Sequence, residues 1–249
     1  MAESLRNIRL ILAYDGSRYH GWQRQPNGIT IQEVIEEKIQ VMAGDAVSLI
    51  ASGRTDAGVH AINQVCHFKT TSSIDPPILK KGLNSLLPGD IHIIDAEDVP
   101  LDFHARYDAK SKTYEYRVLN MEDPDIFQRK YVWHIRMPLD VEEMEKCVAL
   151  LLGTNDFSSF KSSGSGNTNP VRSVLNAGIC GPEKGLLRFI IEADGFLRHM
   201  VRSIVGTLVE AGLGKINDSR FKEIIESKNR SLAGVKAPAQ GLFLMKVLY

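Results

Sequence analysis

One turn in this sequence concentrates the side chains best suited to chemistry. It reads Ser52-Gly53-Arg54-Thr55-Asp56-Ala57-Gly58 and continues into Val59 and His60. The carboxylate of Asp56 can serve as a nucleophile or a base, and the adjacent Arg54 guanidinium favours the ionised form that both roles require. The structural alternative is that Asp56 bonds the backbone two residues later and starts the turn. The turn alone is compatible with both.

A second segment pairs an aromatic ring with a cation. Gly21-Trp22-Gln23-Arg24-Gln25 follows an expected strand. Proteins that recognise RNA combine stacking on bases with contacts to phosphates, which Trp22 and Arg24 could supply. The alternative is a buried Trp22 beside a solvated Arg24, because indole rings are mostly buried.

A third segment, Arg198-His199-Met200-Val201-Arg202, lies in an expected helix. A repeat of 3.6 residues places Arg198 and Arg202 on one face. The core face then carries Val201, Ile204, Val205 and Leu208. Either one arginine points into a cleft or both are solvated, since exposed charges are common.

The amino-acid composition narrows the class of protein but does not identify a binding partner. Lys+Arg and Asp+Glu both number 30, so an RNA site would depend on local segregation of charge. The three cysteines are far apart and predict buried thiols rather than a disulfide or zinc site. His60, His67 and His104 match no compact ligand motif, so we expect no metal. We also expect a cytoplasmic protein without a membrane segment, because neither a signal peptide nor a long apolar run is present.

The periodicity of apolar residues predicts an α+β protein that positions these segments. The expected strands are residues 9–13, 47–51, 64–69, 91–96, 113–119, 171–180, 186–192 and 242–248, and the expected helices are 31–42, 76–86, 141–152, 196–211 and 219–227. We expect two lobes, 1–105 with Asp56 and 106–249, with mixed, largely antiparallel sheets, flanking helices and a central cleft. The Gly/Ser-rich residues 162–169 predict a mobile connecting loop.

The ordered motifs resemble those of the tRNA pseudouridine synthase A family over essentially the whole chain. The most specific is Gly53-Arg54-Thr55-Asp56-Ala57-Gly58-Val59-His60. The others are Tyr14-Asp15-Gly16, Gly21-Trp22-Gln23-Arg24-Gln25, Leu83-Asn84 with Leu87-Pro88, Phe103-His104-Ala105-Arg106, Tyr114-Glu115-Tyr116, Asp156-Phe157-Ser158-Ser159-Phe160 and His199-Met200-Val201-Arg202. The resemblance implies the pseudouridine synthase fold and isomerisation of uridine at positions 38, 39 and 40 of the tRNA anticodon stem-loop.

The resemblance also implies roles for individual residues. Asp56 matches the catalytic aspartate, as nucleophile or base, and Arg54 a residue that contacts RNA and displaces the target base. Tyr114 matches the tyrosine that stacks on uracil, Arg202 an arginine that pairs with the catalytic carboxylate, and Leu242 an apolar residue of the pocket. Contacts with RNA are also expected from Arg24, Arg106 and His60.

The implied reaction needs neither cofactor nor metal, and the implied partners are tRNA and a second copy in a homodimer. Two other classes stay open from the residues alone. A non-catalytic RNA-binding protein would not need Asp56, which is present. A glycosidase or nucleosidase would normally need a second acidic group as general acid, and no obvious partner lies near Asp56 in the sequence.

Overall fold

The protein was analysed as a computed structural model that describes residues 4–162 and 169–249. The expected loop at 162–169 therefore falls largely outside the described residues. The chain divides into two compact units. The first runs to Lys110 and also includes Leu244–Tyr249, and the second is Ser111–Phe243. The expected lobes, 1–105 and 106–249, differ in that the last six residues belong with the first unit.

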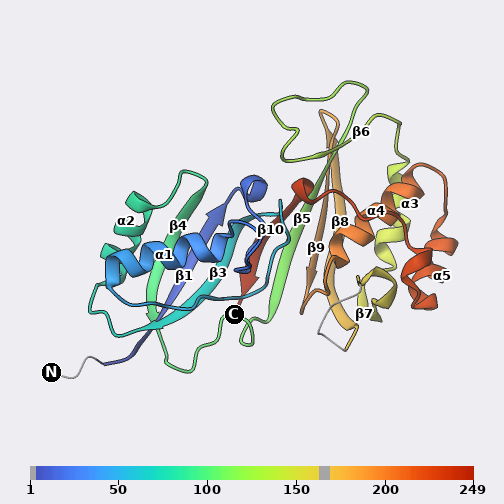
Figure 1. The fold of residues 1–249 in the computed structure, drawn as a ribbon. Coiled ribbons are helices and arrows are strands. Elements are labelled where there is room, and N and C mark those ends of the chain that lie inside the picture. The colour runs from blue at the N-terminus through green and yellow to red at the C-terminus, as the bar shows by residue number, and fades with distance from the viewer. Residues whose placement is uncertain (1–3, 163–168) are drawn as a thin grey trace. The chain divides into compact units, whose positions relative to one another are not determined.

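The first unit is a sheet covered on one face by two helices, α1 (Ile31–Ala43) and α2 (Pro76–Leu86) (Figure 1). Its strands lie in the order β4 (Ile91–Val99), β1 (Arg6–Tyr14), β3 (His60–Thr70) and β10 (Leu242–Leu248), and β2 (Ile50–Ala51) pairs with β3. β1 is antiparallel to both β3 and β4. The short 3₁₀ helix η1 (Gly16–Arg18) follows β1.

The two helices of the first unit begin and end close to the expected residues, because their end signals are local. Thr30 caps α1 by accepting a hydrogen bond from the Glu33 N–H, and Gly44 ends it with φ 76°. Proline at the first position of α2 needs no N–H partner there. The apolar face of α1 is buried through Ile35 and Ile39.

The strand expected at 47–51 is wrong for most of its length, since only Ile50–Ala51 pair with β3. The backbone of Leu49 bonds side chains of α1 instead. Its N–H donates to Glu36 Oε1 at 2.8 Å, and its carbonyl accepts from Gln32 Nε2 at 3.3 Å. These two side chains make the hydrogen bonds that pairing with a neighbouring strand would otherwise supply to the Leu49 backbone.

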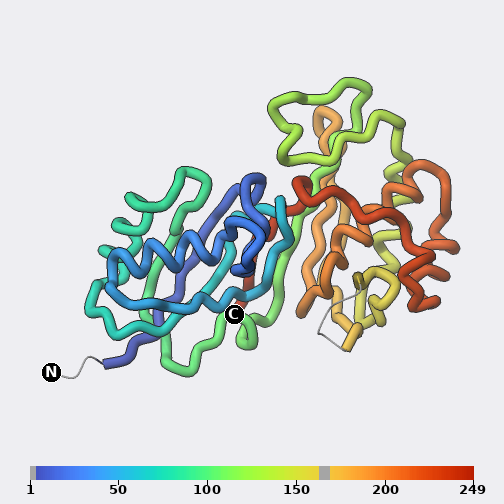
Figure 2. The backbone as a smooth tube through the Cα atoms, in the orientation of Figure 1, coloured from blue at the N-terminus to red at the C-terminus, as the bar shows by residue number. Residues whose placement is uncertain are grey.

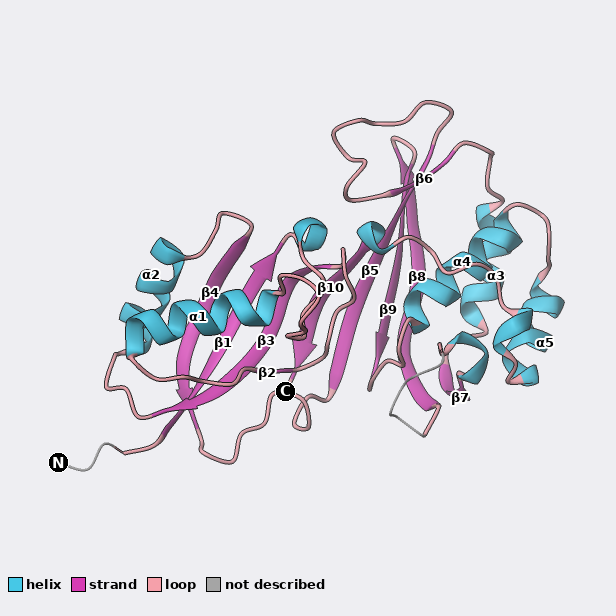
Figure 3. Cartoon of the chain, in the orientation of Figure 1, coloured by secondary structure: helices cyan, strands magenta, loops and turns pink. Residues whose placement is uncertain are grey.

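The second unit has a sheet of strands in the order β5 (Ser111–Asn120), β9 (Leu186–Ala193), β8 (Val171–Glu183) and β7 (Gly153–Asp156). These neighbours are antiparallel, whereas β6 (Trp133–Ile135) pairs with β5 in parallel. α3 (Val141–Ala149) packs against α4 (Met200–Gly212) and α5 (Asp218–Ser227) (Figure 3). Three short 3₁₀ helices, η2 (Ser158–Phe160), η3 (Arg230–Leu232) and η4 (Ala239–Gly241), complete the unit. The α+β fold with mostly antiparallel strands is confirmed.

α4 starts four residues later than expected. His199 precedes it with φ 63°, a left-handed conformation that interrupts a right-handed helix. Arg198 therefore lies outside the helix, and the expectation that it shares a helical face with Arg202 is wrong. The apolar side of the pattern is confirmed, because the core contains Val201, Ile204, Val205 and Leu208.

The end of the chain is tied into the first unit (Figure 2). Asn63 Nδ2 donates to the Met245 carbonyl at 2.9 Å, and the Lys110 N–H donates to the Leu248 carbonyl at 2.8 Å. The Tyr249 hydroxyl donates to the Ala105 carbonyl at 2.6 Å. β10 thus supplies a strand beside β3 that the first 110 residues do not provide.

Cys66 and Cys147 are buried as expected, but Cys180 is exposed because it lies near the end of the β8–β9 hairpin. None of the helices formed by residues 4–162 and 169–249 has the length and apolar character needed to cross a membrane.

Candidate active site

Asp56 lies in the turn between the end of β2 at Ala51 and the start of β3 at His60. Thr55 is buried, whereas Arg54 before it is exposed and Asp56 after it is half-buried. The Val59 N–H donates to the Asp56 carbonyl at 3.1 Å, which closes the turn. The buried Thr55 therefore anchors the turn, and the Arg54 guanidinium and the Asp56 carboxylate lie on either side of it in the sequence.

Side chains of β1 and β3 hold this turn in place through hydrogen bonds. Gln64 accepts a hydrogen bond from Ser52 Oγ at 2.7 Å and donates to the Gly53 carbonyl at 2.9 Å. The Tyr14 hydroxyl lies 2.8 Å from Thr55 Oγ1. Burial raises the pKa of Tyr14 to about 12, so the phenol stays neutral and acts as a hydrogen-bonding anchor.

The loop that contains Trp22 packs against the same turn. The Trp22 N–H donates to the Thr55 carbonyl at 3.0 Å, and its ring lies 6.1 Å from that of Tyr14. Gly21 has φ 86°, and a Cβ on it would lie 2.6 Å from the Thr55 carbonyl oxygen. Trp22 is only 1% exposed, so the buried alternative for this ring is confirmed. The Gly21-Trp22 pair thus supports the position of Asp56 through the backbone.

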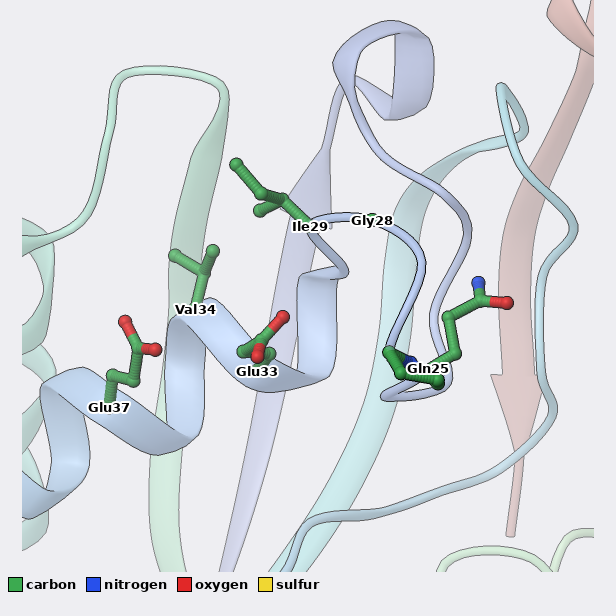
Figure 4. A pocket seen from close by; sticks show the side chains of 7 residues that line it. Gln25, Gly28, Ile29, Glu33, Val34 and Glu37 are labelled. Atoms are coloured by element: carbon green, nitrogen blue, oxygen red, sulfur yellow. The ribbon is translucent and has the colours of Figure 1, made fainter.

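Arg24 is engaged by acidic side chains of α1. Its guanidinium lies 3.7 Å from Glu33 and 3.6 Å from Glu36. A depression of about 520 Å³ beside it is lined by Gln25, Pro26, Gly28, Ile29, Glu33, Val34 and Glu37 (Figure 4). Glutamates in this depression would repel phosphate, and Asp56 does not line it. We therefore do not place the active site there, and the RNA contact of Arg24 stays a prediction.

His60 and Arg106 occupy different environments. His60 is 1% exposed, and its Nδ1 accepts from the Gly16 N–H at 3.2 Å and lies 3.1 Å from Asp15 Oδ1. Its ring therefore ties the start of β3 to the residues after β1. Arg106 is exposed, with its guanidinium 5.7 Å from the centre of the Tyr107 ring. Contact of either residue with RNA stays a prediction.

In the second unit, Arg202 holds the segment before η4. Its Nε donates to the Ala237 carbonyl at 2.8 Å, and the Ala237 N–H donates to the Arg202 carbonyl at 3.0 Å. The next carbonyl, of Pro238, accepts from the Tyr116 hydroxyl at 2.7 Å. Arg202 is 8% exposed, so its solvated alternative is wrong. Tyr116, which sequence reasoning did not single out as a site residue, is signalled only by its place two residues after Tyr114.

Tyr114 and Leu242 lie close to this scaffold in the fold. β5, the strand of Tyr114, contacts both α4 and η4, and Leu242 directly follows η4. The Tyr114 ring packs edge-on against Phe196, with centroids 4.9 Å apart. Tyr114 and Leu242 are 7% and 6% exposed, so small edges of both remain accessible. The second unit therefore assembles the elements of Tyr114, Arg202 and Leu242.

The Tyr116 hydroxyl can be tested by Tyr116→Phe. We expect the free energy of unfolding to fall by about 1–3 kcal/mol, because the change leaves the Pro238 carbonyl without its side-chain donor. Urea denaturation measures this, with Tyr107→Phe as a control because Tyr107 is 75% exposed. Equal effects of the two substitutions would contradict a role of the Tyr116 hydroxyl in holding the segment.

The turn of the first unit holds a half-buried carboxylate of the kind that nucleophilic and acid–base catalysis use. Residues 10–108 and 147–249 match a family model described as tRNA pseudouridine synthase. The chain belongs to this family. It is an isomerase that acts on uridine in tRNA, which decides against a non-catalytic RNA-binding protein and against a glycosidase or nucleosidase.

Relatives extend the similarity to almost the whole chain. Proteins called tRNA pseudouridine synthase A from Thermoanaerobacter sp. (strain X514), Acetivibrio thermocellus and Clostridium kluyveri are 47%, 45% and 44% identical to it. Each alignment covers 98% of this chain and 100% of the relative. These relatives therefore also span residues 109–146, which the family model leaves unmatched.

Proposed function

We propose that this isomerase converts uridine to pseudouridine at positions 38, 39 and 40 of the tRNA anticodon stem-loop, with Asp56 as nucleophile or base. The main support is the turn between β2 and β3, which holds a half-buried carboxylate beside an exposed guanidinium. The relatives named tRNA pseudouridine synthase A support tRNA as the substrate.

The reaction breaks the N1–C1′ bond of uridine, turns the uracil and joins C5 to C1′, while C5 loses a proton and N1 gains one. A single carboxylate can serve it in two ways. Asp56 either attacks C1′ to form a covalent ester-like intermediate or removes the C2′ proton to give a glycal. Neither route changes the redox state, so neither needs a redox cofactor, and the proposal includes no metal.

The other residues are proposed to bind and confine the substrate. Arg54 is exposed next to Asp56, so it can contact a phosphate and occupy the space of the extruded base. Tyr114 stacks on uracil, while Arg202 and Leu242 also contact the substrate and limit access of water. Arg24, Arg106 and His60 are also proposed to assist RNA binding.

Stacking by Tyr114 is tested with two substitutions. Tyr114→Phe keeps the ring, so we expect at least one third of the wild-type kcat/KM. Tyr114→Ala removes the stacking face and should lower kcat/KM by about 10- to 100-fold, as expected for one base-stacking contact. Pseudouridine formation in tRNA measures both, with circular dichroism as a check on folding. Equal losses would assign the role to the hydroxyl rather than to the ring.

We also propose that the protein acts as a homodimer in the cytoplasm, where its tRNA substrate is found. Large apolar side chains that are exposed, among them Ile126 and Phe127, support self-association.

Site-specific mapping tests the proposed specificity. Purified protein is incubated with unmodified tRNA transcripts that carry uridine at 38, 39 or 40 alone, with cytidine at the other two positions. We expect pseudouridine at each single uridine, no free uracil and no product in a transcript with cytidine at all three. Product elsewhere in the tRNA, with none at these positions, would overturn the proposal while leaving the family activity intact.

A further inference from the structure

We propose that Arg117 is a positioning residue that fixes Leu242 for its contact with the substrate, acting from the opposite face of β5. The inference rests on the substrate contact proposed above for Leu242 and adds how that side chain is held. Arg117 lies in β5, and Leu242 is the first residue of β10. Both residues belong to the second unit, which the chain leaves directly after Phe243. The position of Leu242 therefore depends on what holds the last residues of this unit.

The two faces of β5 carry different kinds of side chain. Successive residues of a strand point to opposite faces, so Tyr114 and Tyr116 share one face while Glu115 and Arg117 share the other. The Tyr116 hydroxyl donates to the Pro238 carbonyl at 2.7 Å, just before η4. The tyrosine face is therefore the one that looks towards the proposed substrate-binding residues, and Arg117 lies behind it.

Leu242 and Phe243 are divided between the same two sides. The backbone of Leu242 is extended, with φ −98° and ψ 132°, so its side chain and that of Phe243 point in opposite directions. The Arg117 guanidinium carbon lies 3.9 Å from the centre of the Phe243 ring, which places the ring on the Arg117 side of β5. Leu242 therefore lies on the side that carries Tyr114, where its contact with the substrate is proposed.

Glu115 fixes the guanidinium over the Phe243 ring. Arg117 Nε donates to Glu115 Oε1 at 2.7 Å, and the two side chains are 29% and 9% exposed. A carboxylate this buried is unfavourable unless it is paired, so the pair keeps Arg117 in place. Phe243 is also buried, and the attraction between a cation and an aromatic face is strongest where water is excluded. The contact between Arg117 and Phe243 thus clamps the residue next to Leu242.

The pairing of strands does not account for an arginine at position 117. Its partner in the β5–β9 register is Arg188, and like charges directly opposite each other are unfavourable. Arg188 Nη2 lies 4.0 Å from Glu183 Oε2 in the β8–β9 hairpin, whereas Arg117 contacts Glu115 and Phe243. The clamp on Phe243 supplies the reason that cross-strand pairing lacks.

The residue before Leu242 is held by the same part of β5. A Cβ on Gly241 would lie 2.9 Å from the Arg117 carbonyl oxygen and 2.7 Å from Tyr116 Cζ, so its backbone passes very close to the strand. Leu242 is thus held between two contacts with Arg117, one through the Gly241 backbone and one through the Phe243 ring. Removal of the guanidinium leaves the first contact and releases the second.

The clamp is tested with Arg117→Met in the full-length protein, which removes the guanidinium and keeps an unbranched stem. We expect kcat for pseudouridine formation in tRNA to fall about tenfold, because small displacements of groups that position a substrate slow the reaction strongly. KM for tRNA should stay within about twofold, because contacts with the RNA backbone supply most of the binding. Arg188→Met is the matched control, since Arg188 lies opposite Arg117 on the same face of the sheet. It should keep the wild-type kcat and KM.

Phe243 provides a second test, because Arg117→Met also leaves the buried Glu115 without this partner. Phe243→Leu keeps the pair of Arg117 and Glu115 and should reproduce the loss of kcat. Phe243→Tyr keeps the aromatic face and should retain at least about half of the wild-type kcat. Circular dichroism verifies that each variant is folded. If Phe243→Leu has the wild-type kcat, the stacking on Phe243 does not position Leu242 and the inference is overturned.

A double-mutant cycle with Leu242 separates positioning from a general effect on the fold. Leu242→Ala should lower kcat at least about tenfold, because it removes the apolar contact with the substrate. Arg117→Met added to Leu242→Ala should lower kcat by no more than about twofold further, because no side chain remains to be positioned. Losses that multiply would overturn this inference and leave the proposed contact of Leu242 intact. A wild-type kcat for Leu242→Ala would overturn both, whereas mapping of pseudouridine by the wild-type protein tests the proposed reaction independently.

Discussion

Asp56→Asn should reduce pseudouridine formation at least about 1,000-fold, because the amide can neither attack C1′ nor take a proton as a carboxylate does. tRNA affinity should stay within about tenfold, because removing one carboxylate among many contacts does not abolish backbone recognition. The free energy of unfolding should change by no more than about 1 kcal/mol, because Ser52, Gly53 and Thr55 anchor the turn. Tritium release from tRNA that contains 5-tritiated uridine measures turnover.

Asp102→Asn is the matched control, since Asp102 is an exposed carboxylate of the same unit outside the turn. It should retain wild-type turnover. If Asp56→Asn keeps more than about one hundredth of wild-type activity after its fold and tRNA binding are verified, the catalytic carboxylate lies elsewhere. Asp56→Ala, which removes the oxygen atoms entirely, should behave in the same way and guards against deamidation of the new asparagine.

Gly206→Ala should destabilise the protein by about 3 kcal/mol. A Cβ at this position of α4 would lie 1.7 Å from the Val235 carbonyl oxygen. Alanine ordinarily favours a helix over glycine by about 1 kcal/mol, but the displacement of a backbone carbonyl should outweigh that gain. Activity should also fall, because the displaced segment continues to Ala237, which bonds Arg202. Urea denaturation and the kcat of the folded fraction measure the two effects.

Gly178→Ala provides the comparison within the same unit. Gly178 lies in β8, and a Cβ there would meet no atom within 4 Å. The substitution should leave stability unchanged or raise it by up to about 1 kcal/mol, because alanine reduces the entropy of the unfolded chain. If both glycine variants have the same stability, close packing of α4 against residue 235 does not constrain this unit.

Helix ends with local signals could be predicted from the sequence almost to the residue, whereas α3, expected to reach residue 152, ends at Ala149. Two prolines begin α2, and Asp140 caps α3 by accepting from the Glu143 N–H. The errors occur where distant side chains decide the backbone. Leu49 leaves the expected strand because Gln32 and Glu36 bond it. β6 is too short to produce a periodic pattern and exists because β5 offers it an edge.

The candidate site shows the same division between local and distant information. The turn that contains Asp56 carries a compact motif, so Arg54 and Asp56 could be singled out directly. Tyr116 could not, because its role depends on the Pro238 carbonyl, 122 residues later in the chain. Nor does sequence spacing reveal that Arg202 bonds Ala237 through both its side chain and its backbone.

The position of β10 has a consequence for the order of synthesis. During translation, β3 is made early, while β10, which lies beside it, is made after the other strands of the described residues. Until then β3 keeps an edge that β2 pairs only at Cys66 and His67, and the remaining hydrogen-bonding groups of this edge are open to other strands. The nascent first unit can therefore collapse around α1 and α2 but cannot complete its sheet until Leu242–Leu248 has been made. A stalled or C-terminally truncated chain should be the species most exposed to strand-mediated aggregation and to proteolysis.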